Sequence, residues 1–500
     1  DVERSRGLGD VYKRQIFTAC SAENPEPETT TVQVVNEDTL NITEDNTTFK
    51  LSYTQSDSLN PFDAITQNNQ ILSQLVFEGL FTLDENYKSA LNIASSYSYS
   101  DPKTLNVTIT NGIKFTNGDT ITADDIERSF YNAKKSEYWG NTLLGIDSCN
   151  ADSTSIITFK LEYANPYAHN LLTFPIVAKN ESQSGFPVGS GRYYYDYENN
   201  DVVLKANRDK TGFEPKITTI HLENITSLDS IDNAVNIGNI SFAFRDLSRN
   251  SSEKISAGKK LVNMNNLVYI GINNKSGVTA NAYMRKAISL AVDREVLVKS
   301  AYGNFAQSAS SVFNPQFELS EAKLFEKQAD VNAAKQAIAQ SGISDLSLNL
   351  LVNNNNTDRL SCAKLVKQQL ENAGFSVNIV EAGFDEYTRY VENENFNLYI
   401  GEIKLTNDMN LNAFFTNAGT AKYGIDIDGD TSNAYYNYLN GDAELGSFLL
   451  AFSNEMPYVP LVYRKGMVCF SKAMSGDVQS TVTDNFGNIE NWYFACLLYT

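Results

Sequence analysis

One strand, helix, strand run in the second half of the chain constrains the fold more than any other feature. Residues 346–352, LSLNLLV, alternate apolar and polar side chains as a half-buried strand does. The helical segment that follows ends at Gly374 and has one apolar face, formed by Leu360, Ala363, Val366 and Leu370. Residues 375–381, FSVNIVE, alternate again. The run is therefore predicted to be a βαβ unit, which requires two parallel strands and a right-handed crossover.

Two helical segments before this unit and one strand after it extend the pattern. Residues 281–303 carry an apolar stripe that restarts at Asp293, a residue type common at a helix N-cap. Residues 330–342 run from a capping aspartate to a terminal glycine, and residues 396–402, FNLYIGE, are a further predicted strand. This half of the chain is therefore predicted to form an α/β lobe.

The first half shows a different pattern. Residues 105–110 and 155–163 are predicted strands separated by turns and one helix, and a hairpin is predicted around Asn199 and Asn200. These features indicate an α+β lobe. Because about 450 residues are more than one hydrophobic core normally supports, we expect at least two lobes.

Both ends of the chain have an unusual origin. Residues 5–15, SRGLGDVYKRQ, and residues 496–500, CLLYT, can be back-translated so that one run of codons is the reverse complement of part of the other. This is the pattern of a transposase sequencing adapter read through at both ends of a fragment. We therefore expect residues 1–15 and 495–500 to be adapter-derived, and we exclude them from the fold.

The next segment predicts an anchor. Residues 16–20, IFTAC, are similar to the end of a bacterial lipoprotein signal, in which small residues precede a lipidated cysteine, here Cys20. The alternative is a chance occurrence of Thr-Ala-Cys. Residues 21–46 are rich in Glu, Thr, Asn and Pro, as a disordered tether is. We therefore expect a protein tethered by lipid to the outer face of a membrane.

Charge and cysteine content exclude several classes of function. The 60 acidic and 40 basic residues give a net charge of −20, which argues against binding to nucleic acid or anionic lipid. No apolar run approaches membrane-spanning length. Cys149, Cys362 and Cys469 are an odd number at irregular spacing, so at most one disulfide is possible and no cysteine metal motif exists. We expect no metal and no cofactor.

Three aspartates in residues 111–126, NGIKFTNGDTITADDI, raise the question of a metal site or an acid/base pair. Asn117-Gly118 is instead predicted to be a hairpin turn. Thr122 and Asp125 have the spacing of a capping box at a helix N-terminus, where carboxylates also meet the positive end of the helix dipole. The motif therefore predicts architecture and not catalysis.

Five segments occur in the order found in one family of transport proteins. They are VFEGLFTLDE, LNVTITNGIKFTNGDTITADDI, FPVGSGRYYY, YMRKAISLAVDREVLVKSAYG and EMPYVPLVYRKGMV. Together they resemble the signatures of the family 5 extracellular solute-binding proteins, the receptors of peptide, dipeptide and nickel ABC importers. The resemblance extends from about residue 48 to Phe494.

The resemblance implies an α/β, two-lobe periplasmic-binding-protein-like fold of type II, of the large peptide-binding class, with an extra subdomain in lobe 1. It implies that the ligand is enclosed between hinged lobes. The expected boundaries are residues 47–262 for lobe 1, with the extra subdomain at about 62–180, residues 263–473 for lobe 2, and residues 474–494 for a return to lobe 1.

The resemblance also implies a function. It predicts an extracellular receptor, and not an enzyme, that binds short peptides and delivers them to an ABC permease and its ATPase. We expect a monomer on a Gram-positive cell surface. The alternatives are another small solute such as a nickel or metallophore complex, a surface hydrolase, or a signalling receptor without a permease.

Two acids are candidates for the binding site. Family members that take peptides hold the ligand's amino terminus with a carboxylate just after the strand that corresponds to FNLYIGEI. Here the usual Trp and Asp-Pro elements are replaced by GEIKLTNDMNLN, in which Glu402 and Asp408 are the available acids and Lys404 could neutralise one of them. The alternative is a solvated loop. A buried ammonium–carboxylate contact would need further hydrogen bonds.

Aromatic and early-loop residues complete the predicted site. Tyr138, Trp139 and Tyr423 could sandwich a ligand between rigid rings, and the alternative for each is a place in the core or on the surface. Asn60 and Phe62, in LNPFD, belong to a loop that lines the cleft in the family.

Other chemistries have little support. His169 and His221 lie in unlike contexts, so neither a paired-histidine metal site nor a Ser-His triad is predicted. The segment DIDGDTSNA from Asp426 departs from a calcium loop, because Thr431 stands at its sixth position and Asn437 at its twelfth. Nothing specific indicates the paired carboxylates of a glycosidase.

Overall fold

The computed structural model describes residues 48–247 and 255–494, and the described residues from Phe49 onward form one compact unit. The predicted lipidation site Cys20, the signal remnant, the tether and the adapter-derived ends therefore lie outside the described residues. Within the described ranges, each helix is too short or too polar to span a membrane.

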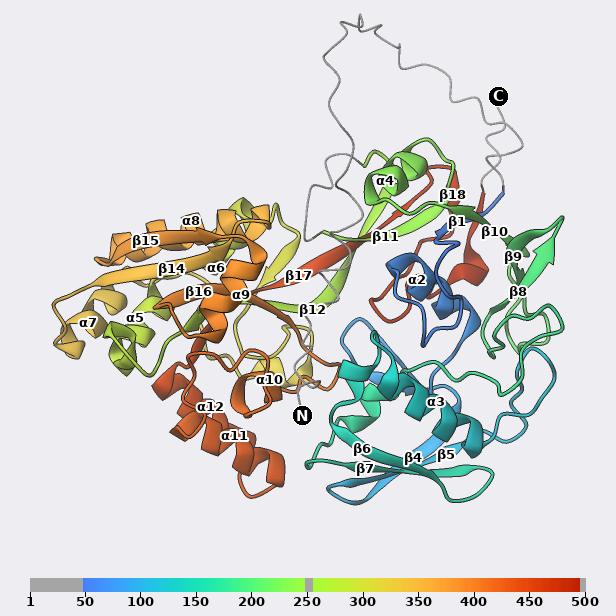
Figure 1. The fold of residues 1–500 in the computed structure, drawn as a ribbon, viewed down its shortest axis with the longest axis horizontal. Coiled ribbons are helices and arrows are strands. Elements are labelled where there is room, and N and C mark those ends of the chain that lie inside the picture. Colours follow the sequence, from blue (N-terminus) through green and yellow to red (C-terminus); the bar gives the residue numbers. More distant parts are fainter. Residues whose placement is uncertain (1–47, 248–254, 495–500) are drawn as a thin grey trace, which may run out of the picture. The chain divides into compact units, whose positions relative to one another are not determined.

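One mixed 11-stranded sheet organises this unit (Figure 1). Its two longest strands, β12 and β17, pair antiparallel and belong to both halves of the sheet. The strands follow in the order β15 (Ser376–Ala382), β14 (Ser347–Asn353), β16 (Leu398–Lys404), β12 (Gly258–Ile272), β17 (Tyr458–Phe470), β11 (Phe242–Asp246), β1 (Lys50–Tyr53), β10 (Thr219–Asn224), β9 (Asp201–Ala206) and β8 (Tyr193–Glu198), with β13 (Ala306–Ser308) pairing with β17.

The predicted βαβ unit is confirmed. Strands β14 and β15 are parallel, with Leu350 opposite Ile379, and α8 (Thr357–Ala373) joins them. Helix α8 ends at Gly374 in the left-handed conformation that glycine adopts without strain (φ +110°). Four helices accompany this half of the sheet: α5 (Ala282–Ala291), α6 (Arg294–Ser300), α7 (Val331–Ser341) and α9 (Phe384–Glu392).

The two predicted N-caps of this half are also confirmed. The Asp293 side chain accepts a hydrogen bond from the Val296 backbone, and the Asp330 side chain accepts one from Ala333. Strand β16 differs from the prediction, because its pairing with β12 continues to Lys404 opposite Asn266. Glu402 therefore lies within the strand and not at its end.

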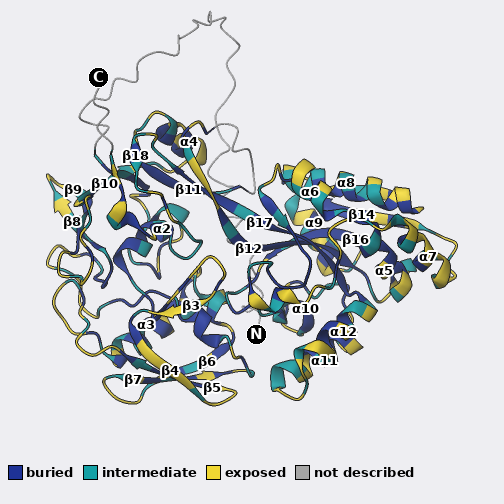
Figure 2. Cartoon of the chain, turned by 180° about the vertical axis from the view of Figure 1, so that it is seen from behind, coloured by how far each residue is buried: buried dark blue, intermediate teal, exposed yellow. Residues whose placement is uncertain are grey.

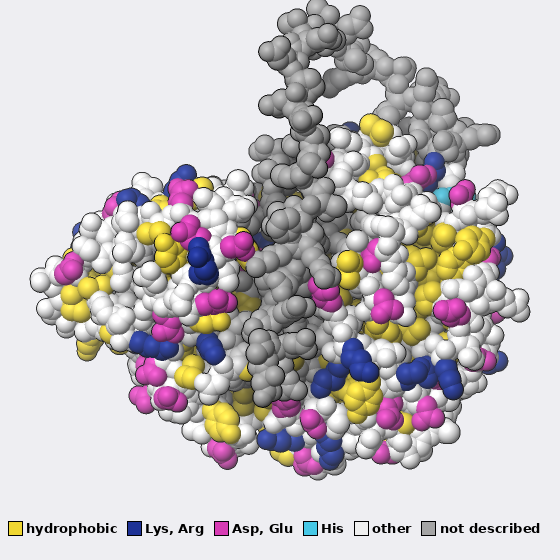
Figure 3. All heavy atoms as spheres, viewed as in Figure 1, with side chains coloured by type: hydrophobic (Ala, Val, Ile, Leu, Met, Phe, Trp, Pro, Cys, Tyr) yellow, Lys and Arg dark blue, Asp and Glu magenta, His cyan; other side chains and the backbone are white. Residues whose placement is uncertain are grey.

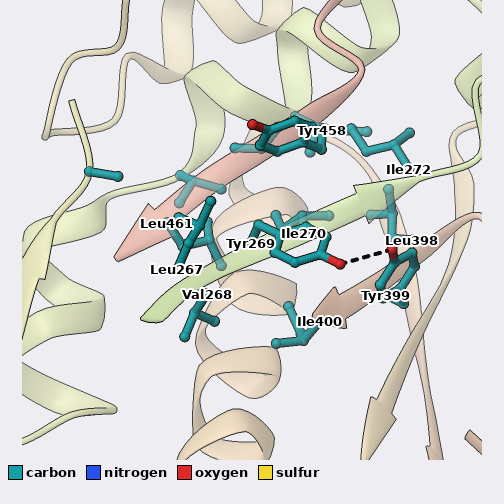
Figure 4. Packing of buried hydrophobic residues seen from close by; sticks show 14 of the residues in the cluster. Leu267, Val268, Tyr269, Ile270, Ile272, Leu398, Tyr399, Ile400, Tyr458 and Leu461 are labelled. Atoms are coloured by element: carbon teal, nitrogen blue, oxygen red, sulfur yellow. Dashed lines mark hydrogen bonds between the residues drawn. The ribbon is translucent and has the colours of Figure 1, made fainter. Parts of the chain in front are cut away.

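A large hydrophobic core fills this half of the unit. Leu267, Ile270 and Leu398 on the strands β12 and β16 are buried in this core, and the hydroxyls of Tyr269 and Tyr399 are 3.2 Å apart (Figure 4). The core continues under three short helices: α10 (Asn412–Phe415), α11 (Asp430–Asn440) and α12 (Leu445–Glu455). At this end the Phe414 and Tyr458 rings stack 4.0 Å apart, centre to centre.

The other half contains a second large core (Figure 2). A four-stranded sheet packs against α3 (Ala123–Lys135) there, and its strands are β4 (Ala94–Asp101), β5 (Thr104–Ile109), β7 (Ile156–Leu161) and β6 (Ile146–Ala151). Strands β5 and β7 confirm the two predicted strands. The hairpin of β8 and β9 is confirmed as well, because Asn199 (φ +52°) and Asn200 (φ +70°) form its two-residue turn.

The remaining elements of this half come from distant parts of the chain. They are α2 (Gln67–Val76), α4 (Leu228–Asn236), the paired strands β2 (Phe81–Leu83) and β3 (Ser89–Leu91), and the paired strands β18 (Met474–Ser475) and β19 (Tyr493–Phe494). Trp492 is fully buried, and its ring lies 5.2 Å from that of Phe242 in β11. The last described segment therefore packs in the same core as the first strands.

Candidate ligand-binding site

The two halves of the sheet meet at an irregularity in β12. Asn263 faces Lys465 of β17, and Leu267 faces Tyr463, so three residues of β12 lie opposite Arg464 alone. In this bulge the Asn265 amide donates to the carbonyls of Leu405 (3.0 Å) and Thr406 (2.9 Å). The loop that follows β16 is therefore attached to the point where the chain crosses between the halves.

Glu402 lies beside this crossing, and nearby arginines compensate its negative charge. Its Oε1 contacts the Arg464 guanidinium and accepts a hydrogen bond from the Asn266 amide at 3.0 Å. Its Oε2 lies 3.2 Å from Nη2 of Arg359, at the start of α8. The Glu402 side chain is only 6% exposed, so it is not part of a solvated loop. The cations that compensate it are the two arginines, whereas the predicted partner Lys404 is exposed.

Asp408 lies in the loop that follows β16 and occupies a different electrostatic environment from Glu402. Its carboxylate is buried and accepts hydrogen bonds from Thr406 Oγ1 (2.5 Å), Asn165 Nδ2 (2.7 Å) and the Asn410 backbone (3.3 Å). Among the described residues no lysine, arginine or histidine forms an ion pair with it. Burial raises the pKa of Asp408, and the hydrogen bonds from Thr406 and Asn165 oppose that shift in part. The solvated-loop alternative is therefore wrong for this residue too.

The contact with Asn165 joins the two halves. Asn165 lies just before η3 (Ala168–Leu171), 243 residues away in sequence, and its own Oδ1 accepts from the Tyr167 backbone at 2.9 Å. The Tyr167 hydroxyl donates to Glu318 at 2.5 Å. The Asn170 amide reaches the carbonyls of Tyr87 (3.0 Å) and Asn407 (3.3 Å). Asp408 is thus enclosed at a polar contact between the halves.

The predicted aromatic residues do not join this constellation. Tyr138 and Trp139 follow α3, where their rings contact each other at 5.2 Å, and Trp139 packs against the core of its own half. Tyr423 packs against the other core and precedes Gly424, whose carbonyl accepts from the Asn274 backbone just beyond the far end of β12. Since residues 266–272 span about 20 Å of extended chain, Tyr423 lies far along the lobe from Asp408.

The early loop uses its predicted residues for its own structure. The Asn60 side chain accepts a hydrogen bond from the Phe62 backbone at 3.1 Å, and Phe62 is a buried core residue. Asn165, Asn170 and Arg464 were not predicted as site residues. No sequence signal identifies them, because isolated asparagines in a loop and an arginine within a strand have no periodicity or motif spacing.

The residues considered for other chemistries have structural roles or form no site among the described residues. The Asp125 carboxylate accepts from the Thr122 backbone (3.0 Å) and hydroxyl (2.8 Å), which confirms the predicted cap at the start of α3. Cys149, Cys362 and Cys469 are all buried free thiols. No group of three or more His, Cys, Asp or Glu side chains within residues 48–247 and 255–494 has the geometry to hold a metal ion.

Two hollows in the surface of the described residues are lined by neither Glu402 nor Asp408. One, of about 250 Å³, lies between α11 and α12 and is lined by Asp430, Ser447, Leu450, Ala451, Asn454 and Glu455. The other is only about 10 Å³ and lies between α2, β1 and β11. Acidic and basic side chains are interspersed on the face shown in Figure 3.

This architecture is that of a two-lobe binding protein, and comparisons with known proteins agree. The structure of CtaP, an ABC transporter substrate-binding protein from Listeria monocytogenes, superposes with a TM-score of 0.70 at 18% identity, covering 89% of this chain and 99% of that one. NikZ from Campylobacter jejuni, solved in complex with Ni(L-His), gives a TM-score of 0.63 at 18% identity, covering 90% and 100%. These similarities establish the α/β two-lobe fold.

Sequence comparisons define the family. Residues 89–424 match the family described as bacterial extracellular solute-binding proteins, family 5. The glutathione-binding protein GsiB of Salmonella paratyphi A is 23% identical over 347 residues, which are 64% of this chain and 67% of that protein. The chain therefore belongs to the family 5 extracellular solute-binding proteins, which are extracytoplasmic receptors of ABC importers and not enzymes.

Proposed function

We propose that this protein captures short peptides between its two lobes and that Asp408 accepts the ligand's amino terminus. The observation that carries the proposal is a buried carboxylate that contacts both lobes and whose hydrogen-bond donors among the described residues are neutral. A buried acid of this kind is best satisfied by a cation. The ammonium group of a peptide would take the place of the Asn165 amide and keep the bond to Thr406.

Closure follows from the position of this acid. A ligand held at Asp408 touches lobe 2 directly and touches lobe 1 near Asn165 and Asn170, so it makes its full set of contacts only when the lobes are together. Ligand binding then shifts the population toward the closed form by the difference in affinity. A dissociation constant on the order of 1 μM would correspond to about 8 kcal/mol.

The domain boundaries and the anchor belong to the same proposal. Lobe 1 comprises residues 47–262 and 474–494, with an extra subdomain at about 62–180, and lobe 2 comprises residues 263–473. Lipidation of Cys20 would tether a monomeric receptor to the cell surface beside its permease and ATPase. Packing of Trp492 against Phe242 supports the return of the chain to lobe 1.

A metal complex is the second candidate. The solved NikZ structure contains Ni(L-His), and its fold similarity to this chain is comparable to that of CtaP. The residues around Asp408 favour an organic ammonium ligand, because their contributions are hydroxyl and amide groups and His169 is held between Tyr97 and Tyr99.

Mass spectrometry of the purified protein, first native and then denaturing, tests the proposal. Expression in rich medium should yield a ladder of co-purified short peptides. Calorimetry with a tripeptide should then show binding that is lost when the amino terminus is acetylated. A single metal complex in the spectrum, or equal affinity for free and acetylated peptides, would overturn the assignment of Asp408.

A further inference from the structure

The pairing of strand β17 is irregular on both edges at Arg464. On one edge, its pairing with β12 is interrupted by the bulge between Asn263 and Leu267. On the other edge, β11 ends where Asp246 faces Gly466, and β13 begins where Ala306 faces Arg464. A strand that keeps one partner on each side resists bending, whereas a bulge is a local kink. Arg464 therefore stands at a break in the regular β12–β17 pairing.

The side chain of Arg464 contacts an acid of each lobe from this position. Its Nη2 pairs with Asp246, at the end of the lobe 1 strand β11, and its Nη1 pairs with Glu402 in the lobe 2 strand β16. The arginine thus spans from the lobe 1 edge of β17, across β12, to the lobe 2 sheet. The backbone just after Arg464 is held as well, because the Lys465 amide donates to the Phe305 carbonyl at 2.8 Å.

Burial makes this arrangement sensitive to lobe movement. The side chains of Arg464 and Glu402 are 3% and 6% exposed, and that of Asp246 is 21% exposed. Water cannot readily replace a lost partner at such a site, so separating one carboxylate from the guanidinium is costly. Bending the ribbon at the bulge changes the separation of β11 and β16, and with it the distance between the two acids that one arginine must reach.

We propose that Arg464 is a hinge clamp that holds Asp246 of lobe 1 and Glu402 of lobe 2 together and so sets the resting balance between open and closed lobes. This assigns Glu402 to the hinge and leaves ligand contact to Asp408. The clamp acts whichever solute the receptor carries, so it does not depend on the peptide assignment. It is a positioning device and touches no ligand.

Distances between spin labels in the ligand-free protein test the clamp. Labels at Asn132→Cys in α3 and Tyr436→Cys in α11 lie on exposed positions of lobe 1 and lobe 2. Cys20→Ser and Cys496→Ser remove two native thiols, and the other three are buried. Burial raises the pKa of Asp358, the neighbour of Arg359, to about 6. The distances are therefore measured by pulsed electron resonance at pH 8, where this carboxyl does not titrate.

The variant Arg464→Met should move the distance distribution of the ligand-free protein toward longer separations, because the link between the acids of the two lobes is lost. Arg285→Met is the matched control. Arg285 is also buried, but it donates to the carbonyls of Thr279, Ala280 and Glu455 within lobe 2. The control should lose stability without changing the distance between lobes.

An unchanged distance distribution in folded Arg464→Met would overturn the proposal. If that variant does not fold, the triple variant Asp246→Asn, Glu402→Gln, Arg464→Met removes the clamp without leaving unpaired acids at these positions. The same shift toward longer distances in the triple variant supports the clamp, and a wild-type distribution refutes it. Because the measurement uses no ligand, a failure of the peptide assignment would leave it intact.

Discussion

Replacing Asp408 by asparagine should have opposite effects on the ligand-free protein and on ligand binding. Asparagine preserves the geometry, because its oxygen can accept from Asn165 while its amide donates to Thr406 Oγ1, which turns to accept. Only the weaker bond from Asn410, at 3.3 Å, has no equivalent. The substitution therefore removes a negative charge from a buried site with little change in packing.

The sign of the stability effect follows from the raised pKa of Asp408. The folded state keeps this proton to a higher pH than the unfolded chain, whose carboxyl has its ordinary value of 3.8. The stability that the buried acid contributes is therefore complete below that value and is lost as pH rises through the raised pKa. The asparagine side chain is a neutral substitute for the protonated acid. Asp408→Asn should therefore be more stable than the natural protein at pH values above the raised pKa of Asp408, and no more stable below pH 3.8.

The expected magnitudes can be estimated. Ionising a buried group without a cation costs about 1–3 kcal/mol, and a chain of this size shifts its melting temperature by roughly 1 °C per kcal/mol. We therefore expect Asp408→Asn to melt about 1–3 °C higher than the natural protein at pH 8 without ligand. Loss of a charged hydrogen bond of about 1.5–3 kcal/mol should weaken a peptide with a free amino terminus about 10- to 150-fold.

Scanning calorimetry at pH 5 and pH 8, together with titration calorimetry against free and acetylated tripeptides, measures both effects. Asp428→Asn, an exposed acid of the same lobe, is the control and should change neither quantity. If Asp408→Asn melts lower than the natural protein at pH 8, or binds both peptides as the natural protein does, then Asp408 is a structural acid and the argument from its missing cation is wrong.

Three further predictions concern the fold. Leu350→Ala, in the fully buried centre of β14, should lower the free energy of unfolding by about 2–5 kcal/mol in urea titration, and a loss below about 1 kcal/mol would show that the core is not packed there. Asn200→Val should destabilise the β8–β9 turn by about 1–2 kcal/mol because valine resists a positive φ, whereas Asn200→Gly should be nearly neutral; equal effects would disprove the turn. Burial raises the pKa of Cys362 and of Cys469 to about 12, so neither thiol should react with an aromatic disulfide reagent until the chain unfolds, and fast reaction of the native protein would contradict their burial.

The parts of the fold that the sequence predicted are those with a local physical cause. Helix α7 (Val331–Ser341) lies between Asp330 and Gly342 because the Asp330 side chain caps its first turn and Gly342 ends it in the left-handed conformation. The βαβ unit follows from apolar periodicity within one short segment. The end of β16 was misplaced by two residues, because the partner strand β12, more than 120 residues earlier in sequence, decides how far its pairing continues.

The sequence could narrow the ligand-binding carboxylate to two residues, Glu402 and Asp408, but could not decide between them. Nothing within the segment GEIKLTNDMN distinguishes Glu402 from Asp408, because their partners lie elsewhere in the chain. Arg464 is 62 residues from Glu402, and Asn165 is 243 residues from Asp408. Pairing over such distances is set by the sheet order and by lobe contact, and neither can be obtained from residue types and their spacing.

The difference between these two acids is itself an argument about function. Arg464 and Arg359 compensate the charge of Glu402, and Asn266 adds a hydrogen bond to its Oε1. Asp408, six residues later, is at least as well buried but is surrounded by groups that leave its charge in place. A chain that already supplies two arginines to one buried acid has no physical obstacle to supplying a cation to the other. We therefore propose that a cation of the ligand completes the environment of Asp408.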